Sequence, residues 1–534
     1  MSSAEGTADG GGVASAAAPA DVAVLPTRFH GLVVAGIMLA TILPLLDTTI
    51  ANVAIPHMQS ALSATPESVM WVLTSYIIAH AVAMPLTGWL SDRIGSRQLF
   101  LYSTAGFIFT SMLCGIAQNI EQMVIYRTLQ GIAGAFIMPL SQSLLLDVSR
   151  PSRHPQMMTI WGFGAVLGPI MGPLAGGWIT ENWDWRWAFL VNVPLGLISL
   201  LVLYFTLPGH PKKRRPFDLT GFVLVGLCMA SFQLMLDRGQ QVDWFDALES
   251  WIYLFIALST LWMAIVHLAT SSNPLFDRAL FHDVNFLIAF IFMMVVGMVI
   301  YATAALLAPM LQVLFHFTAY DTGVVIAPRG IGAMIAMQFA NRMISRGVDP
   351  RLPITLGFGF AIWSLYAMSG WTLEVSLPQF LWTGVVQGLG IGFITMPIYI
   401  VAFATLAPRL RTDAAGLLNL SRLMGSSVMI SVVTTLLARS VQTSHSDMGG
   451  HINASASAII DTATAGQFRE FSESALRMVD AEINRQAAMI GYVNDFWLIM
   501  WLTVAAAPLI LLVRRAGSPP PAAAKPLATA PEPS

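Results

Sequence analysis

The sequence predicts an all-α membrane protein of about fourteen transmembrane helices. Of its 534 residues, 56% are hydrophobic and only 10% are charged, whereas an ordinary soluble domain carries about 25% charged residues. A water-soluble fold of this size could not hide so much apolar surface from solvent. The apolar residues also form long runs instead of the alternating segments of about 10 residues that a membrane β-barrel uses.

A spanning helix needs about 20 mostly apolar residues, and runs of this length recur along the chain. They lie near residues 31–51, 69–90, 98–117, 122–145, 157–179, 187–207, 218–236, 250–270, 285–310, 321–341, 352–371, 377–401, 413–437 and 494–513.

Basic residues gather in alternate connections between these runs. When the first run starts on the cytoplasmic side, the cytoplasmic segments hold most of the 27 Lys and Arg residues, which agrees with the positive-inside rule. We therefore expect both termini in the cytoplasm. Four tryptophans between residues 178 and 187 fit an aromatic belt at the external end of the fifth and sixth runs.

Other functional classes are disfavoured by composition. The net charge of -2 gives no reason to expect nucleic acid as a partner. Cys114 and Cys228 lie far apart in apolar runs, so neither a disulfide framework nor a thiolate metal site is expected. Lys212, Lys213 and Lys525 are the only lysines and none follows glycine, which excludes a P-loop. We expect no catalytic residue, metal or cofactor.

Two runs share a weak internal echo. Residues 130–139 and 387–397 both begin with Gln-Gly and end at Met-Pro. Many transporters consist of repeated halves that rock around a central site. Coincidence between low-diversity apolar sequences is the alternative.

The connection after the second run carries a motif of glycines and charges: Gly88, Asp92, Arg93, Gly95 and Arg97. Gly88 permits close helix approach, Gly95 permits a tight turn, and Asp92 can pair with a base or a helix end. A solvated turn without function is the alternative. The motif resembles the signature of the major facilitator superfamily, although Ser96 stands where that family usually has a basic residue.

The fifth run resembles the antiporter motif of the same superfamily. Its residues are Gly164, Gly168, Pro169, Gly172, Pro173, Gly176 and Gly177. Small residues four apart let two helices touch backbone to backbone, and proline kinks a helix. The resemblance implies a hinge and seal, whereas an ordinary packing face is the alternative. Thr159 departs from the longest version of the motif.

Four further segments resemble the fourteen-helix drug:proton antiporter branch, and most closely its EmrB-like inner-membrane multidrug efflux pumps. They are residues 46–56, 141–146, 236–239 and 494–497, and the resemblance extends from about residue 30 to 515. It implies two six-helix bundles plus two inserted helices. The expected parts are a tail at 1–28, a bundle at 29–208, a basic loop with two helices at 209–283, a bundle at 284–515 with an external loop at 439–493, and a tail at 516–534.

Asp47 is the strongest candidate for proton coupling because it is the only acid well inside the first run. A charge within the hydrocarbon costs about 2.5 kcal/mol or more and is by default functional. Burial favours the protonated carboxyl and a nearby cation favours the carboxylate. The resemblance implies that Arg127, in a basic family motif, faces the cavity and tunes this proton. A static pair, or an Asp47 near the water boundary, is the alternative.

Several other polar residues in the runs are candidates. His80 titrates near neutral pH if it is exposed, although a neutral packing role is favoured over coupling. Arg329 and Arg422 could reach the interface, pair across the halves or contact an anionic substrate. Possible cavity residues are Gln130, Gln142, Asn52, Arg329 and Arg422.

The external loop is expected to contain one amphipathic helix that caps the external mouth. Phe468, Phe471, Ala475, Val479 and Ile483 recur at helical spacing. The resemblance implies that a periplasmic adaptor protein, joined to an outer-membrane channel, binds on this side. A helix that packs only on its own chain is the alternative.

The expected function is export of drugs or other apolar or amphipathic small molecules across the bacterial inner membrane, driven by a proton gradient in a tripartite pump. A stand-alone exporter or importer of a specific metabolite on the same fold is the alternative. A membrane enzyme or receptor would need clustered acids or metal ligands at one depth, which the sequence lacks.

Overall fold

Helices account for most of the residues that the structure describes. The computed structural model describes residues 22–209, 212, 216–239, 241–451 and 473–513, and these residues contain helices and turns but no strand. The fold class predicted from the apolar runs is confirmed.

The principal helices are α1 (His30–Ala61), α2 (Pro66–Ala83), α3 (Thr87–Ile94), α4 (Ser96–Gly115), α5 (Ile120–Gly134), α6 (Ile137–Asp147), α7 (His154–Asn182), α8 (Trp187–Leu190), α9 (Asn192–Thr206), α10 (Leu219–Gly239), α11 (Leu248–Thr270), α12 (Arg278–His282), α13 (Val284–Pro309), α14 (Ala319–Ser345), α15 (Arg351–Met368), α16 (Leu377–Ala404), α17 (Arg411–His451) and α19 (Glu473–Ala506).

Twelve helical segments in the described part of the chain are long and apolar enough to cross a membrane. Two further helices, α7 and α15, coincide with the remaining two expected spans, so the helices are compatible with a count of fourteen. Some spans are divided. A 3₁₀ turn at Met84–Leu86 joins α2 to α3, where Pro85 cannot donate a backbone hydrogen bond.

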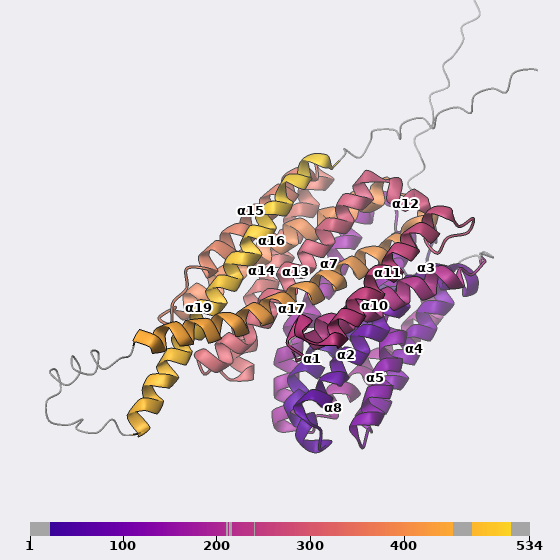
Figure 1. Cartoon of the computed structure of the whole chain (residues 1–534). Helices are drawn as coiled ribbons and strands as arrows, with labels where there is room; N and C mark the ends of the chain where they lie inside the picture. Colours follow the sequence, from indigo (N-terminus) through magenta and orange to yellow (C-terminus); the bar gives the residue numbers. More distant parts are fainter. Residues whose placement is uncertain (1–21, 210–211, 213–215, 240, 452–472, 514–534) are drawn as a thin grey trace, which may run out of the picture.

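The helices pack as two groups (Figure 1). In the first, α1 packs against α7 and α9, and α5 packs against α2 and α4. In the second, α16 packs against α14 and α15, while α17 packs against α13 and α19. The groups meet where α7 contacts α14 and α16, and where α17 contacts α3 and α6. The division into bundles at residues 208 and 284 stays a prediction.

The two helices between these groups form a hairpin. α10 packs against α11 along its length, and it also contacts α2 of the first group and α17 of the second. α11 presents most of its apolar surface outward, since only 11% of its most apolar window is buried. Lipid is the solvent that such a surface requires.

Ala475, Val479 and Ile483 of the predicted amphipathic helix do lie in a helix, but this helix is the first part of α19 and runs on into the last span. α17 continues to His451, and α19 already begins at Glu473, so both extend beyond the expected spans. Their extensions project past the bundle in Figure 1. The chain has no proline between Pro408 and Pro508, so the helices do not stop where the apolar residues end. Phe468 and Phe471 lie outside the described residues.

One end of the predicted N-terminal tail is held against the bundle. Leu25 is buried, and its N–H donates to the carbonyl of Asp147 at 2.8 Å. His30 and Ser149 lie 3.0 Å apart, Nε2 to Oγ. Residues 1–21 and the predicted tail at 516–534 lie outside the described residues.

Candidate functional site

The two charges predicted to act together form a buried ion pair. Arg127 Nη1 on α5 donates to Asp47 Oδ2 on α1 at 2.5 Å, and both side chains have no solvent exposure. The alternative that placed Asp47 near the water boundary therefore does not hold. A fully desolvated pair depends on good geometry and on hydrogen bonds to its remaining atoms.

Neutral side chains add further hydrogen bonds to this pair. Gln130 Nε2 donates to Asp47 Oδ1 at 3.0 Å, and Asn192 Nδ2 on α9 donates to the same oxygen at 2.9 Å. Arg127 also donates to Gln130 Oε1 at 2.8 Å and to the carbonyl of Val72 at 3.1 Å. Asp47 on α1 is thus held from two other helices, α5 and α9, and we name Asp47, Arg127, Gln130 and Asn192 the carboxylate cluster.

Aromatic rings enclose the guanidinium of Arg127. Its Cζ lies 4.6 Å from the ring centroid of Tyr76 and 5.3 Å from that of Phe189. Such faces attract a cation more strongly when water is excluded. Two polar atoms of the carboxylate cluster are buried without a hydrogen-bond partner in the described part of the chain: Arg127 Nη2 and Asn192 Oδ1.

Sequence reasoning missed three members of this environment: Tyr76, Phe189 and Asn192. Asn192 could have been found, because it is the only polar amide within the apolar run at 187–207. It also donates to Ser111 Oγ at 3.1 Å, which fixes its orientation. The two aromatic residues carried no signal, since aromatic residues are common in spanning helices.

His80 lies on α2, one turn beyond Tyr76, and does not join the carboxylate cluster. The His80 and Tyr76 rings have centroids 5.6 Å apart. Its Nδ1 is buried without a hydrogen-bond partner in the structure.

The motif after α2 lies where the two helix groups touch. A Cβ at Gly88 would lie 1.4 Å from Oδ1 of Asp413 on α17, so only glycine fits this contact. Gly95 has φ of 96° and joins α3 to α4, a backbone conformation that favours glycine. Asp92 and Arg93 lie in the last turn of α3.

The remaining residues of this motif contact neighbouring helices. Arg97 Nη2 donates to the carbonyl of Tyr204 on α9 at 2.6 Å. Ser96, which departs from the family pattern, is buried and accepts a hydrogen bond from Ser91 Oγ at 3.1 Å. The serine thus replaces a charge with a local, satisfied contact.

Polar contacts between the helix groups continue from α6 to α17. The pairs are Asp147 Oδ1 with Arg411 Nη1 at 3.5 Å, Ser143 Oγ with Thr412 Oγ1 at 2.9 Å, and Gln142 Oε1 with Asn419 Nδ2 at 2.9 Å. Together with Gly88 and Asp413, these residues form what we name the gate contacts. The groups are therefore closed against each other at the end that we expect to be cytoplasmic.

Among the candidate cavity residues, Gln142 is one of the gate contacts and Arg422 lies next to them. Arg422 Nη2 donates to Asn419 Oδ1 at 3.3 Å, so Asn419 bridges Arg422 and Gln142. Asn52 is exposed on α1, away from the carboxylate cluster.

The glycines of the predicted antiporter motif form a stripe along α7 that packs against α1. A Cβ would lie 2.2 Å from Met38 at Gly164, 2.5 Å from Leu45 at Gly168, and 1.8 Å from Thr49 Oγ1 at Gly172. Gly176 faces Ile50, and Pro169, Pro173 and Gly177 lie within the same helix. The stripe therefore contacts the stretch of α1 that carries Asp47.

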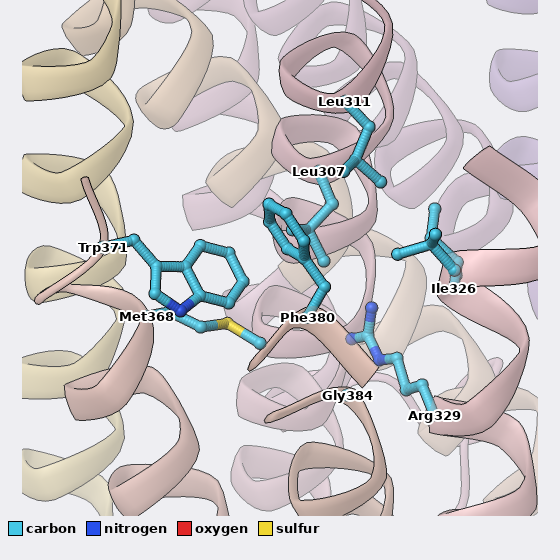
Figure 2. Close-up of a pocket in the computed structure, with 9 residues that line it drawn as sticks. Leu307, Leu311, Ile326, Arg329, Met368, Trp371, Phe380 and Gly384 are labelled. Carbon is cyan, nitrogen blue, oxygen red and sulfur yellow. The ribbon is translucent and has the colours of Figure 1, made fainter. Parts of the chain in front are cut away.

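Arg329 lies apart from these residues, in a small pocket of the second helix group. Figure 2 shows its guanidinium pointing from α14 toward the pocket, beside Phe380 and Ile326. The other lining residues are Leu307, Leu311, Val325, Met368, Trp371 and Gly384.

Known proteins resemble this chain over most of its length. The Major Facilitator Superfamily matches residues 37–430. The chain is 33% identical over 478 residues to the multidrug export protein EmrB of Haemophilus influenzae, covering 88% of this chain and 92% of that protein. It is 32% identical over 475 residues to the fatty acid resistance protein FarB of Neisseria gonorrhoeae, covering 88% of this chain and 94% of that protein.

The fold is also found among solved structures. The proton:xylose symporter XylE superposes with a TM-score of 0.56 at 12% identity, covering 91% of this chain and 99% of that chain. At this identity the likeness shows the fold alone.

Proposed function

Because the chain belongs to the Major Facilitator Superfamily, we propose that it is a proton-coupled antiporter that exports drugs or other apolar and amphipathic small molecules. It is a multi-pass membrane transporter and not an enzyme. The relatives named as multidrug export proteins support export. The buried ion pair of Asp47 and Arg127 supports the coupling.

The carboxylate cluster offers two chemical states. With Asp47 ionised, its carboxylate accepts from Arg127, Gln130 and Asn192. A proton on Asp47 removes the negative charge and leaves the buried Arg127 cation without a counter-ion. Since an uncompensated buried charge is costly, protonation favours a rearrangement that brings water or another group to Arg127.

The helix contacts provide a route from this cluster to the other helix group. Asp47 lies on α1, which packs along the glycine stripe of α7, and α7 in turn packs against α14. Met337 of α14 touches Gly162, on the side of α7 away from α1. At Gly172, α7 has no side chain of its own between its backbone and Thr49 of α1. A movement of α1 should therefore move α7, and through α7 also α14.

A proton gradient provides enough free energy for this exchange and no cofactor is needed. One charge moving through 100 mV releases about 2.3 kcal/mol, and each unit of pH difference adds about 1.36 kcal/mol. The sum is sufficient for a substrate gradient of several hundredfold.

The test is Asp47→Asn in proteoliposomes under an imposed pH gradient, with a panel of dyes, antibiotics and fatty acids. We expect gradient-driven export to be lost, because an amide cannot exchange a proton, while substrate counterflow without a gradient continues. Asp184→Asn, an exposed acid paired with Arg186, is the matched control and should transport normally. Full gradient-driven export by a correctly inserted Asp47→Asn protein would refute the coupling role.

We further propose an inner-membrane location with both termini in the cytoplasm, and an adaptor that binds the helical extensions of α17 and α19. The extensions support this because they project past the bundle and hold each other through His445 and Asp480, 2.8 Å apart. A stand-alone exporter or importer is the alternative. Replacing residues 445–480 with a short linker should abolish co-purification of the adaptor but leave liposome transport intact. Unchanged co-purification would show that the adaptor does not bind the extensions, and no adaptor with the unmodified protein would favour the alternative.

A further inference from the structure

The second helix group buries an arginine that has no acidic partner. Arg329 on α14 is only 8% exposed. Its Nη2 donates to Thr303 Oγ1 at 2.6 Å and to the carbonyl of Ile300 at 3.0 Å, both on α13. Among the residues that the structure describes, no carboxylate lies within ion-pair distance of this guanidinium.

The first helix group shows how this chain otherwise treats a buried arginine. Arg127 has the Asp47 carboxylate at 2.5 Å, and that acid is supplied by α1. At Arg329 the corresponding contact to a neighbouring helix is made by the neutral hydroxyl of Thr303. A buried cation with only neutral partners is costly and points to a functional role.

The backbone around Arg329 is packed tightly enough to hold it in place. A Cβ at Gly388 of α16 would lie 1.9 Å from the Arg329 carbonyl oxygen, so these two helices touch at the glycine. On the neighbouring residue, Gln387, both side-chain amide atoms are buried without a hydrogen-bond partner in the structure. The region therefore offers unused hydrogen-bonding capacity as well as an uncompensated charge.

The pocket in front of Arg329 is apolar. Trp371, Phe380, Leu307 and Met368 line it together with Arg329 (Figure 2). One cationic end and an apolar, aromatic wall match a molecule with an anionic head and an apolar body. The pocket is narrow in this conformation, so the helices must part for such a molecule to enter.

We propose that Arg329 is the specificity-determining residue for amphipathic carboxylates, whose head group takes the position of the missing counter-ion. The proposal rests on the export function proposed above and names one of its substrate classes. The carboxylate accepts hydrogen bonds from Arg329, and the apolar part of the molecule lies against Trp371 and Phe380.

The first test compares binding of laurate and dodecanol, which share a chain and differ in charge, to the full-length protein in phosphatidylcholine nanodiscs. We expect laurate to bind about tenfold more tightly or better, as a charge-assisted pair allows. Arg329→Gln should remove this preference, and Arg329→Lys should keep part of it. No preference in the unmodified protein, or equal losses for both ligands in Arg329→Gln, would overturn the proposal.

The second test fills the place of the missing acid and does not depend on removing Arg329. Thr303→Asp should pair with Arg329, raise the Tm and weaken laurate binding by about tenfold or more, as loss of a charge-assisted pair predicts. Thr303→Asn, of the same shape but neutral, is the matched control and should keep the preference for laurate. Equal laurate affinity in the two variants would overturn the assignment.

Two further measurements distinguish this proposal from a failure of proton coupling and from binding of a lipid head group. Asp47→Asn should keep the preference for laurate over dodecanol even if both affinities change together, so a failure of proton coupling leaves the specificity result intact. Discs that contain phosphatidylglycerol distinguish a free amphiphile from a lipid head group. An unchanged Kd supports the free amphiphile, whereas loss of laurate binding in those discs assigns the site to lipid and overturns the substrate role.

Discussion

Gly88→Ala should open the gate contacts selectively. The added methyl group would lie 1.4 Å from Oδ1 and 2.4 Å from Cγ of Asp413. Asp413 is only 6% exposed and engaged in other interactions, so it cannot turn aside freely. Overpacking of this kind costs about 1–3 kcal/mol. The cost applies only while α3 touches α17, so the equilibrium should shift toward the open arrangement by about 5- to 150-fold.

Disulfide formation between Ser143→Cys and Thr412→Cys measures this shift. The two native hydroxyl oxygens are 2.9 Å apart, so the paired thiols should react quickly while the gate contacts are closed. The native Cys114 and Cys228 are both buried and give little background. We expect Gly88→Ala to slow the cross-linking in proportion to the lost closed population.

Gly359→Ala is the matched control for this prediction, because a Cβ there meets open space. Removing the obstructing carboxylate should restore closure. Gly88→Ala should therefore slow the cross-linking less when Asp413→Ala is also present than it does in the otherwise unmodified protein. Cross-linking at an unchanged rate in Gly88→Ala would show that α3 and α17 do not depend on this glycine.

Two other substitutions test the packing and the cluster. Gly172→Ala should lower the free energy of unfolding by about 1–3 kcal/mol, because its Cβ would lie 1.8 Å from Thr49 Oγ1. Gly31→Ala, whose Cβ meets nothing within 4 Å, should be neutral in the same thermal unfolding assay. Equal Tm values for the two variants would contradict the steric argument. Asn192→Leu removes the 2.9 Å hydrogen bond to Asp47 and should lower the free energy of unfolding by about 1.5–3 kcal/mol. Gradient-driven transport should be affected more than counterflow. A variant with unaltered stability and transport would show that Asn192 does not support the carboxylate.

The sequence alone pointed to Asp47, because charges within apolar runs are rare and costly, and the family resemblance pointed to Arg127. It could not show how closely Asp47 and Arg127 approach, or that Tyr76 and Phe189 enclose the guanidinium. Such distances depend on how helices far apart in the chain are rotated against each other. Periodicity within one helix does not determine that rotation.

The gate contacts illustrate a second limit. Gly88 was recognised as a position of close approach, but its partner Asp413 lies in a different helix group and carries no local signal. The extensions of α17 and α19 were readable in principle, since the absence of proline between Pro408 and Pro508 permits continuous helices. The expected spans end where the apolar residues end, although no helix-breaking residue stands there.

The α10–α11 hairpin makes the two seams between the helix groups unequal. α10 touches Val82 of α2 through Gly226, while Leu236 accepts a hydrogen bond from Ser431 of α17 at 2.8 Å. Trp244, in the turn of the hairpin, donates to Thr435 of α17 at 2.9 Å. The hairpin therefore separates the seam between α2 and α17 from a molecule dissolved in the lipid. We expect lateral entry from the bilayer to be confined to the opposite side, where α7 and α14 pack directly against each other.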